Sequence, residues 1–143
     1  MYKLPIDFLS EANASGSYED AWAINSGNYK TVAAIPSEFG GFSGGFSPED
    51  LFLQSMINCF IGTFKVYAKA SKIAFTQISV TGKLMVDQGE AGKVIMKKAF
   101  LKIKVQGSDR PDRIETLVAK TFRDGFILNS VKTEIQHSLE VTF

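Results

Sequence analysis

The sequence predicts an α+β protein, and three observations lead to this prediction. Residues 48–70 read as a long apolar helix, alternating strands are expected on both sides of it, and an amphipathic helix is expected from Pro111 to Gly125. The chain has 143 residues, which fits one domain, residues 1–143, that can bury a core without disulfides. It contains no internal repeat, linker or low-complexity segment.

The first 35 residues predict two or three short antiparallel strands. The β-prone pieces FLSEAN, YEDAWAIN and YKTVAAI are separated by Ser-Gly and Ser-Gly-Asn turns. Residues 36–46, PSEFGGFSGGF, then form a glycine-rich loop. This loop lacks the Gly-Lys-Ser/Thr ending of a phosphate-binding loop, so we interpret it as a hinge and turn element.

The segment SPEDLFLQSMINCFIGTF, residues 47–64, predicts the start of the long helix. Ser47 is placed to cap it, Pro48 suits its first turn, and Glu49 and Asp50 favour the positive end of the helix dipole. The apolar residues that follow leave almost no polar face. A domain of this size rarely encloses such a helix alone, so we expect a second copy of the chain to cover part of it. The alternative is a monomer whose sheet and second helix wrap it.

The second half of the chain predicts a hairpin, a helix and a last strand. Residues 78–86 and 99–105 alternate around the turn DQGEAG, and a shift of register near Lys97-Lys98 indicates a bulge. The second helix should end at Gly125, and residues 131–143 alternate again. The buried side of that helix is expected to carry Ile114, Leu117, Val118, Thr121 and Phe122.

Composition limits the partners and the compartment. The net charge of +1 argues against a nucleic-acid partner or an anionic membrane surface. The single cysteine cannot form an internal disulfide, which favours a reducing compartment, and we expect the cytoplasm. The N-terminal MYKLPIDFLSEA carries acidic residues and Pro5 too early for a signal peptide, and no apolar run reaches membrane-spanning length.

Cys59, the only cysteine, is the candidate nucleophile. Taken alone, a cysteine in an apolar helix is a small core residue more often than a reactive thiol. The surrounding pattern changes this interpretation: Gly44-Gly45, Pro48-Glu49-Asp50-Leu51, and then Cys59 ten residues after Glu49. This pattern resembles the OsmC/Ohr family of osmotically inducible and organic-hydroperoxide-resistance proteins, and the order of elements extends the resemblance in outline over the whole chain.

The resemblance implies an OsmC-like fold, with antiparallel sheets around a long buried helix, in an intertwined homodimer with two sites at the subunit interface. It implies that Cys59 is the catalytic cysteine that attacks a peroxide, and that Glu49 matches a catalytic glutamate that holds an activating arginine. It implies no cofactor and no metal. Ten helical residues span about 15 Å, so Glu49 cannot touch its own Cys59 and must act through an intermediary or across the dimer.

The chain departs from the family pattern at two places. The second cysteine, which resolves the sulfenic acid, falls where this chain has Gly125, and the family arginine falls near Tyr18. The cations that could replace that arginine are Lys30, Lys65 and Arg123. Two functions stay open: a weak one-cysteine peroxidase that reduces a small hydrophobic hydroperoxide with an external thiol, or a non-catalytic dimer that binds a lipophilic ligand at the interface.

Three further features have structural interpretations. Six of the twelve phenylalanines lie within residues 39–64, where we expect core and dimer packing rather than an apolar pocket beside Cys59. His137 lies on the apolar register of the last strand and is expected to be a packed or surface residue, not a metal ligand. The lysines of residues 93–104 should line the solvated face of a sheet. The six phenylalanines are Phe39, Phe42, Phe46, Phe52, Phe60 and Phe64.

Overall fold

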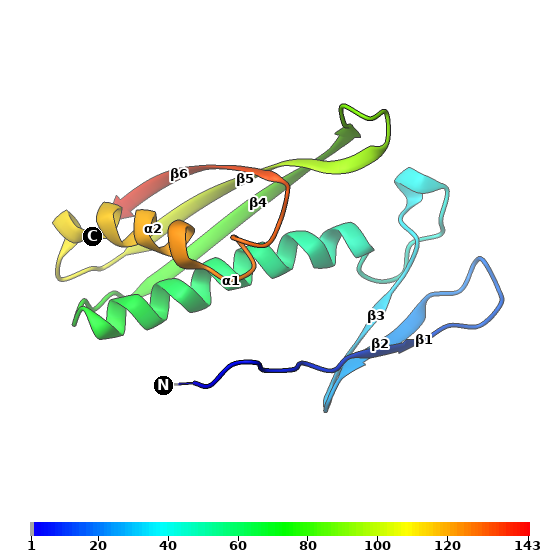
Figure 1. Cartoon of the computed structure of the whole chain (residues 1–143), viewed down its shortest axis with the longest axis horizontal. Coiled ribbons are helices and arrows are strands. Elements are labelled where there is room, and N and C mark those ends of the chain that lie inside the picture. Colours follow the sequence, from blue (N-terminus) through cyan, green and yellow to red (C-terminus); the bar gives the residue numbers. More distant parts are fainter. Residues whose placement is uncertain (1) are drawn as a thin grey trace. The chain divides into compact units, whose positions relative to one another are not determined.

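The computed structural model describes residues 2–143 and shows an α+β chain with two sheets and two α-helices (Figure 1). The chain divides into two compact units, one ending at Leu51 and the other spanning Phe52–Phe143. The prediction that residues 1–143 act as one domain stays a prediction.

The N-terminal unit contains the three predicted strands. β1 (Glu11–Asn13), β2 (Trp22–Ser26) and β3 (Tyr29–Ala33) form an antiparallel sheet in the order β1-β2-β3. The glycine-rich loop follows and contains a short 3-10 helix, η1 (Ser37–Phe39). Its glycines allow close packing, because a β-carbon on Gly45 would lie 2.6 Å from the carbonyl oxygen of Val32.

The C-terminal unit is built on a second sheet with the order β4-β5-β6. β4 (Gln77–Gln88) and β5 (Val94–Gln106) are antiparallel, and the register shifts where Met85 pairs with Lys98 and Val86 with Met96. Lys97 is therefore the extra residue, and the predicted bulge is confirmed. α2 (Pro111–Asp124) follows β5, also as predicted.

β6 (Glu134–Thr142) corrects the expectation of purely antiparallel sheets. It pairs with β5 in parallel, from Lys98 opposite Glu134 to Gln106 opposite Thr142. The reason is the crossover through α2, which returns the chain to the starting end of β5 before β6 begins. The strand also begins later than the alternating pattern from residue 131 suggested.

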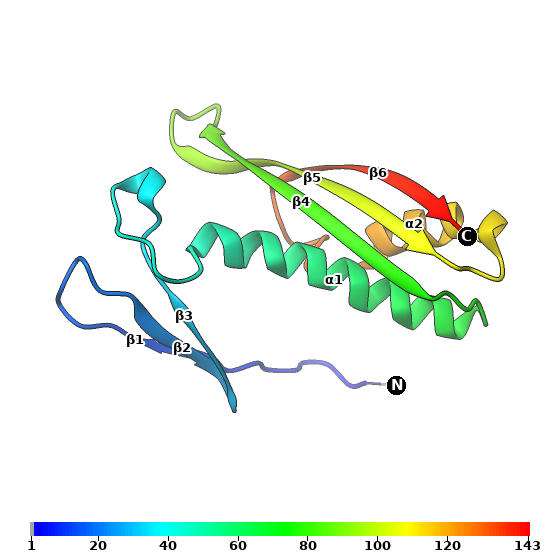
Figure 2. The ribbon, with the colours of Figure 1, turned by 180° about the vertical axis from the view of Figure 1, so that it is seen from behind.

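The core of this unit lies between the sheet and the two helices. The inner face of β5 is almost fully buried, with Ala99, Leu101, Ile103 and Val105 each at most 1% exposed. α1 (Pro48–Ala70) contributes Met56, Phe60 and Phe64 to the same cluster, and α2 contributes Ile114, Leu117 and Val118. Figure 2 shows α1 lying along the length of β4.

α1 begins and ends at the predicted residues, but the C-terminal unit does not bury it all round. Its buried residues form one stripe: Met56, Ile57, Phe60, Phe64 and Ala68. On another face the side chain of Val66 is 64% exposed. One sheet and one helix therefore cover only part of the apolar surface of α1. Within residues 2–143, neither α1 nor α2 combines the length and the apolar character that a bilayer-spanning helix needs.

Candidate functional site

The N-terminal end of α1 is capped as the sequence predicts. The amide of Asp50 donates to Ser47 Oγ at 2.9 Å, and the amide of Ser47 donates to Asp50 Oδ2 at 3.0 Å. This reciprocal pair satisfies two amides at the start of the helix. Glu49 lies between these two residues in the sequence. Its Oε1 is buried, and no described residue forms a hydrogen bond with it. A buried polar oxygen without a donor is costly.

Cys59 lies in the middle of α1 on a half-buried face. Its side chain packs against the core cluster, and its Sγ lies 4.0 Å from Oγ1 of Thr63, one turn further along the helix. The segment that follows α2 reaches the same sulfur. A β-carbon added to Gly125 would lie 3.2 Å from Sγ of Cys59. The structure thus brings together Cys59 and Gly125, the position that the resemblance matches to the second cysteine.

Gly125 is required by space and not by its backbone conformation. We expected it to end α2 as a helix-terminating glycine, and α2 does end at Asp124. However, Gly125 has φ −62° and ψ 127°, an extended conformation that any residue adopts. A β-carbon there would lie 2.8 Å from Cδ1 of Leu128 and 3.1 Å from the carbonyl oxygen of Thr121. Leu128, 7% exposed, therefore fills the space beside Cys59 that a side chain at position 125 would occupy.

A polar cluster joins the C-terminal end of α2 to α1. Tyr67 donates a hydrogen bond of 2.7 Å from its hydroxyl to Oδ2 of Asp124. Arg123 donates two more to the same carboxylate, each at 2.8 Å. These bonds, those from Arg123 first, hold the pKa of Asp124 well below its usual range, and Asp124 in turn raises the pKa of Arg123. Nζ of Lys120 lies 4.4 Å from the centre of the Tyr67 ring.

Comparison with known proteins decides the family. Residues 41–140 match the family described as OsmC-like protein. The chain belongs to the OsmC-like protein family. It is 30% identical over 115 residues to the organic hydroperoxide resistance protein of Xanthomonas axonopodis pv. citri (strain 306), an alignment that covers 79% of each chain.

Two solved OsmC-like structures share the fold at low identity. The OsmC-like protein of Mycoplasma pneumoniae aligns with a TM-score of 0.84 at 12% identity, over 98% of this chain and all of its own. An OsmC-like protein of unknown function from Vibrio cholerae aligns with a TM-score of 0.86 at 16% identity, over 95% of this chain and all of its own. The predicted OsmC-like fold is confirmed at the level of the chain.

None of the three cations suggested for the missing arginine of this OsmC-like chain is placed by the structure as a partner of Cys59. The guanidinium of Arg123 is committed to Asp124, and its side chain is 69% exposed. Lys65 is exposed on α1 six residues after Cys59, which puts it on another side of the helix. Lys30 lies on β3, in the other unit. Tyr18, near the family arginine position, donates from its hydroxyl to the carbonyl oxygen of Gly40 at 3.1 Å.

The phenylalanines of this OsmC-like chain divide into two groups. Phe60 and Phe64 are fully buried and Phe52 packs against them, so the packing interpretation is confirmed for these three. In contrast, the three phenylalanines of the glycine-rich loop are exposed: Phe39 by 53%, Phe42 by 64% and Phe46 by 44%.

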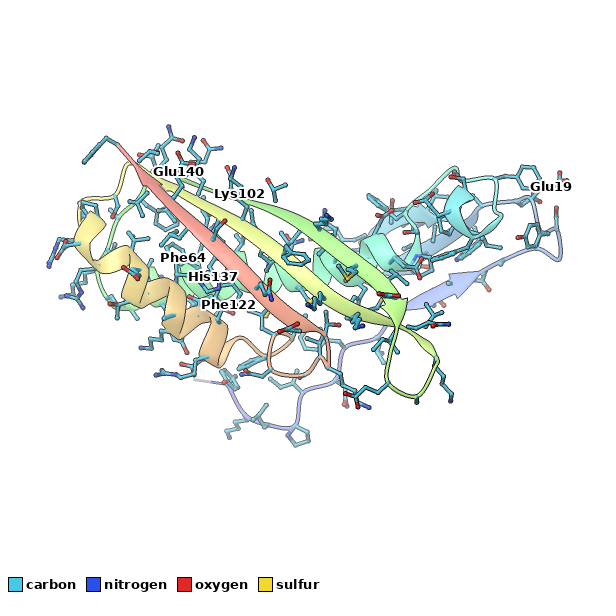
Figure 3. All side chains as sticks on the ribbon, turned by 90° about the horizontal axis from the view of Figure 1, so that it is seen from above. Glu19, Phe64, Lys102, Phe122, His137 and Glu140 are labelled. Carbon is cyan, nitrogen blue, oxygen red and sulfur yellow. The ribbon has the colours of Figure 1, made fainter. Side chains whose placement is uncertain are left out.

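His137 is a surface residue that packs on α2. Its ring stacks on Phe122 with the centroids 4.3 Å apart and the planes 24° from parallel (Figure 3). Within residues 2–143 no group of three His, Cys, Asp or Glu side chains is placed to hold a metal ion.

Sequence reasoning missed Tyr67, Asp124 and Leu128. One signal was available: Cys59, Thr63 and Tyr67 recur every four residues and so lie on one stripe of α1. The partners of that stripe on α2 could not be read from the sequence, because they depend on how the two helices dock.

Proposed function

We propose that this OsmC-like protein is a one-cysteine, thiol-dependent peroxidase that reduces small hydrophobic organic hydroperoxides in oxidative stress defence. The observation that supports it most is the contact between Cys59 and Gly125, because the family mechanism needs the second cysteine beside the first. The likeness to a relative named organic hydroperoxide resistance protein supports the substrate class.

The proposed cycle uses Cys59 as the nucleophile. Its thiolate attacks the outer oxygen of the hydroperoxide, an S–O bond forms, the O–O bond breaks, and the alkoxide leaves and takes up a proton to become an alcohol. Cys59 is then a sulfenic acid. An external thiol attacks the sulfur and releases water, which gives a mixed disulfide. A second external thiol releases the Cys59 thiol and leaves as an external disulfide, so two electrons pass from the two thiols to the peroxide.

Glu49 is the second residue that we assign to the site. Its buried and unpaired Oε1 is suited to hold a donor group that the single chain does not supply. About 15 Å of helix separates it from Cys59, so it acts on another copy's site or through an intermediate group. A homodimer provides both possibilities.

We infer that the protein works as a homodimer in the cytoplasm. The exposed face of α1, marked by Val66, is the surface that a second copy would cover. A reducing compartment supplies the external thiols that the cycle consumes and is consistent with a chain that has one cysteine. The proposal involves no nucleic acid, membrane, metal or cofactor.

Turnover should be slow compared with a family member that keeps both cysteines and the arginine. Arg123 is tied to Asp124, so its guanidinium is not free to stabilise the leaving alkoxide. Loss of one positioned donor at a developing oxyanion costs about 10²–10³ in rate. Without a second cysteine, the sulfenic acid is also open to over-oxidation.

The experiment is peroxide consumption with cumene hydroperoxide and dithiothreitol. The wild type should consume peroxide, and Cys59→Ser should abolish consumption while keeping the circular dichroism spectrum and melting temperature. Equal consumption by both proteins would overturn the proposal.

A second candidate function is favoured by the exposed phenylalanines of the 36–46 loop. Phe39, Phe42 and Phe46 offer apolar surface that suits a lipophilic ligand without any chemistry at Cys59. Titration calorimetry with a fatty acid separates the two functions. Equal binding by the wild type and Cys59→Ser, together with no peroxide consumption by either, would favour the binding protein.

A further inference from the structure

Five residues of the C-terminal unit, on α1 and at the C-terminal end of α2, are arranged around Cys59. Cys59, Thr63 and Tyr67 lie on one stripe of α1, with 4.0 Å between Sγ and Oγ1 of Thr63. Tyr67 is bonded to Asp124 at 2.7 Å, and Asp124 directly precedes Gly125. Gly125 lies close to Cys59, since a β-carbon added to it would be 3.2 Å from Sγ.

The hydrogen bond between Tyr67 on α1 and Asp124 on α2 is the strongest interaction among these five residues. The carboxylate of Asp124 accepts the Tyr67 bond and both Arg123 bonds, and hydrogen bonds to an ionised acceptor are stronger than neutral ones. The side chain of Asp124 is 31% exposed, so water weakens this cluster only in part. The lowered pKa of Asp124 agrees with an ionised acceptor at neutral pH.

The segment that follows Asp124, residues 125–130, is held together by backbone hydrogen bonds. The amide of Asn129 donates to the carbonyl of Gly125 at 2.9 Å, and the amide of Ser130 donates to that of Ile127 at 2.9 Å. The side chain of Leu128 anchors it in the core cluster. We call residues 125–130 the Cys59 cover. Its first residue, Gly125, directly follows Asp124, and the amide of Gly125 donates to the carbonyl oxygen of Thr121 at 2.9 Å.

We propose that Tyr67 and Asp124 are positioning residues for Cys59: their hydrogen bond holds the Cys59 cover against the sulfur and sets how readily another sulfur or a small reagent reaches it. This proposal deepens the proposed peroxidase and rests on it for its role in the cycle. During that cycle an external thiol must approach the oxidised Cys59 next to the cover. The bond therefore limits regeneration and protects the sulfur from other reagents.

Two measurements with opposite expected changes test the proposal. The first is the rate of Cys59 alkylation by iodoacetamide under native conditions, which should rise about fivefold to tenfold in Tyr67→Phe, the change expected from loss of one hydrogen bond. The second uses a Gly125→Cys protein and measures how much glutathione is needed to reduce the disulfide between positions 59 and 125. This equilibrium gives the effective concentration of one thiol at the other, which should fall by a similar factor when Tyr67→Phe is added. If the Cys59 cover is held less firmly, the sulfur of Cys59 is more exposed to reagents. Position 125 is then also held less closely against that sulfur.

The matched control is Asp109→Ala, at the opposite end of α2. Oδ1 of Asp109 accepts a hydrogen bond of 2.9 Å from the amide of Ala74, so this variant also removes one bond that ties the segment before α2 to the segment after α1. It should leave both measurements unchanged. Asp124→Asn keeps an acceptor for Tyr67 and should give a smaller change than Tyr67→Phe.

The outcomes separate this proposal from the proposed function. If Tyr67→Phe changes neither alkylation nor the disulfide equilibrium, or if Asp109→Ala changes them equally, the positioning role is wrong. Alkylation and disulfide exchange do not depend on peroxide turnover. A wild type without peroxidase activity would therefore overturn the proposed function and leave this test intact.

Discussion

A β-carbon placed on Gly125 would lie 3.2 Å from the Sγ atom of Cys59. In a disulfide, the β-carbon of one cysteine lies about 3 Å from the sulfur of the other, as the bond lengths require. The two positions therefore lie at a separation that suits a disulfide, although position 125 carries glycine. Leu128 occupies the remaining space.

The first prediction is that Gly125→Cys forms a disulfide with Cys59. The new side chain needs a shift of Leu128 Cδ1, the flexible end of that side chain, which is 2.8 Å from the added β-carbon. It also needs a smaller adjustment at the carbonyl oxygen of Thr121, which is 3.1 Å away. Peroxide should produce the disulfide, and turnover with dithiothreitol should rise because the sulfenic acid is trapped at once. Non-reducing mass spectrometry and thiol titration measure it. Gly16→Cys, between β1 and β2 with nothing within 4 Å of its β-carbon, is the control and should remain reduced. Free thiols in the Gly125→Cys protein after peroxide would refute the prediction.

The second prediction concerns the cost of a side chain at position 125. Gly125→Ala should lower the free energy of unfolding by about 1 kcal/mol, since the methyl group crowds Leu128 and the carbonyl of Thr121. Gly62→Ala is a matched control in open space within α1 and should raise it by about 0.5–1 kcal/mol through helix propensity. Urea unfolding measures both. Equal changes in the free energy of unfolding for Gly125→Ala and Gly62→Ala would contradict the crowding around Cys59.

The third prediction is a pH dependence at Asp124. Its pKa is lowered by Arg123 and then by Tyr67, so its stabilising effect is complete above the unfolded-state pKa, about 3.9, and is lost as the pH falls further. The melting temperature of the wild type should exceed that of Asp124→Asn by a constant amount from about pH 7 to 5. The difference should shrink below about pH 4.

The control for this pH dependence is Arg123→Gln, which removes the group that lowers the pKa most. In the Arg123→Gln protein, the decrease in melting temperature caused by Asp124→Asn should be smaller at every pH. A difference that grows as the pH falls below 4 would have the wrong sign and would remove Asp124 as an ionised acceptor.

The fourth prediction concerns the second copy of the chain. Val66 is 64% exposed on α1 and Val94 is 62% exposed at the start of β5. If a second copy covers the open face of α1, Val66→Glu should weaken the dimer, because a charge would be buried in it. Val94→Glu is the control and should leave association unchanged. Sedimentation measures both, and a monomeric mass for the wild type at micromolar concentration would exclude the dimer.

Local patterns predicted most of the elements, because their causes lie within a few residues. Ser47 and Pro48 define the start of α1, and the apolar spacing after Pro111 defines α2. The bulge at Lys97 followed from a break in alternation. The parallel pairing of β6 could not be predicted in this way, since alternation is the same in parallel and antiparallel strands.

For the candidate site, the sequence suggested residues but not their contacts. The resemblance to the family motif pointed to Cys59, Glu49 and Gly125, and their roles stay predictions. The contact between Gly125 and Cys59, and the bond from Tyr67 to Asp124, join segments some sixty residues apart in the sequence. Such contacts depend on the docking of α2 against α1, which no local pattern encodes.

The most direct measurement of the proposed chemistry is the mass of the protein after one equivalent of cumene hydroperoxide in the presence of dimedone, which traps sulfenic acids. The wild type should carry a single dimedone adduct, mapped by peptide analysis to Cys59, and Cys59→Ser should carry none. Peroxide loss without an adduct on Cys59, or an unreacted Cys59 after the peroxide has been left for hours, would contradict a peroxidase that works through this cysteine.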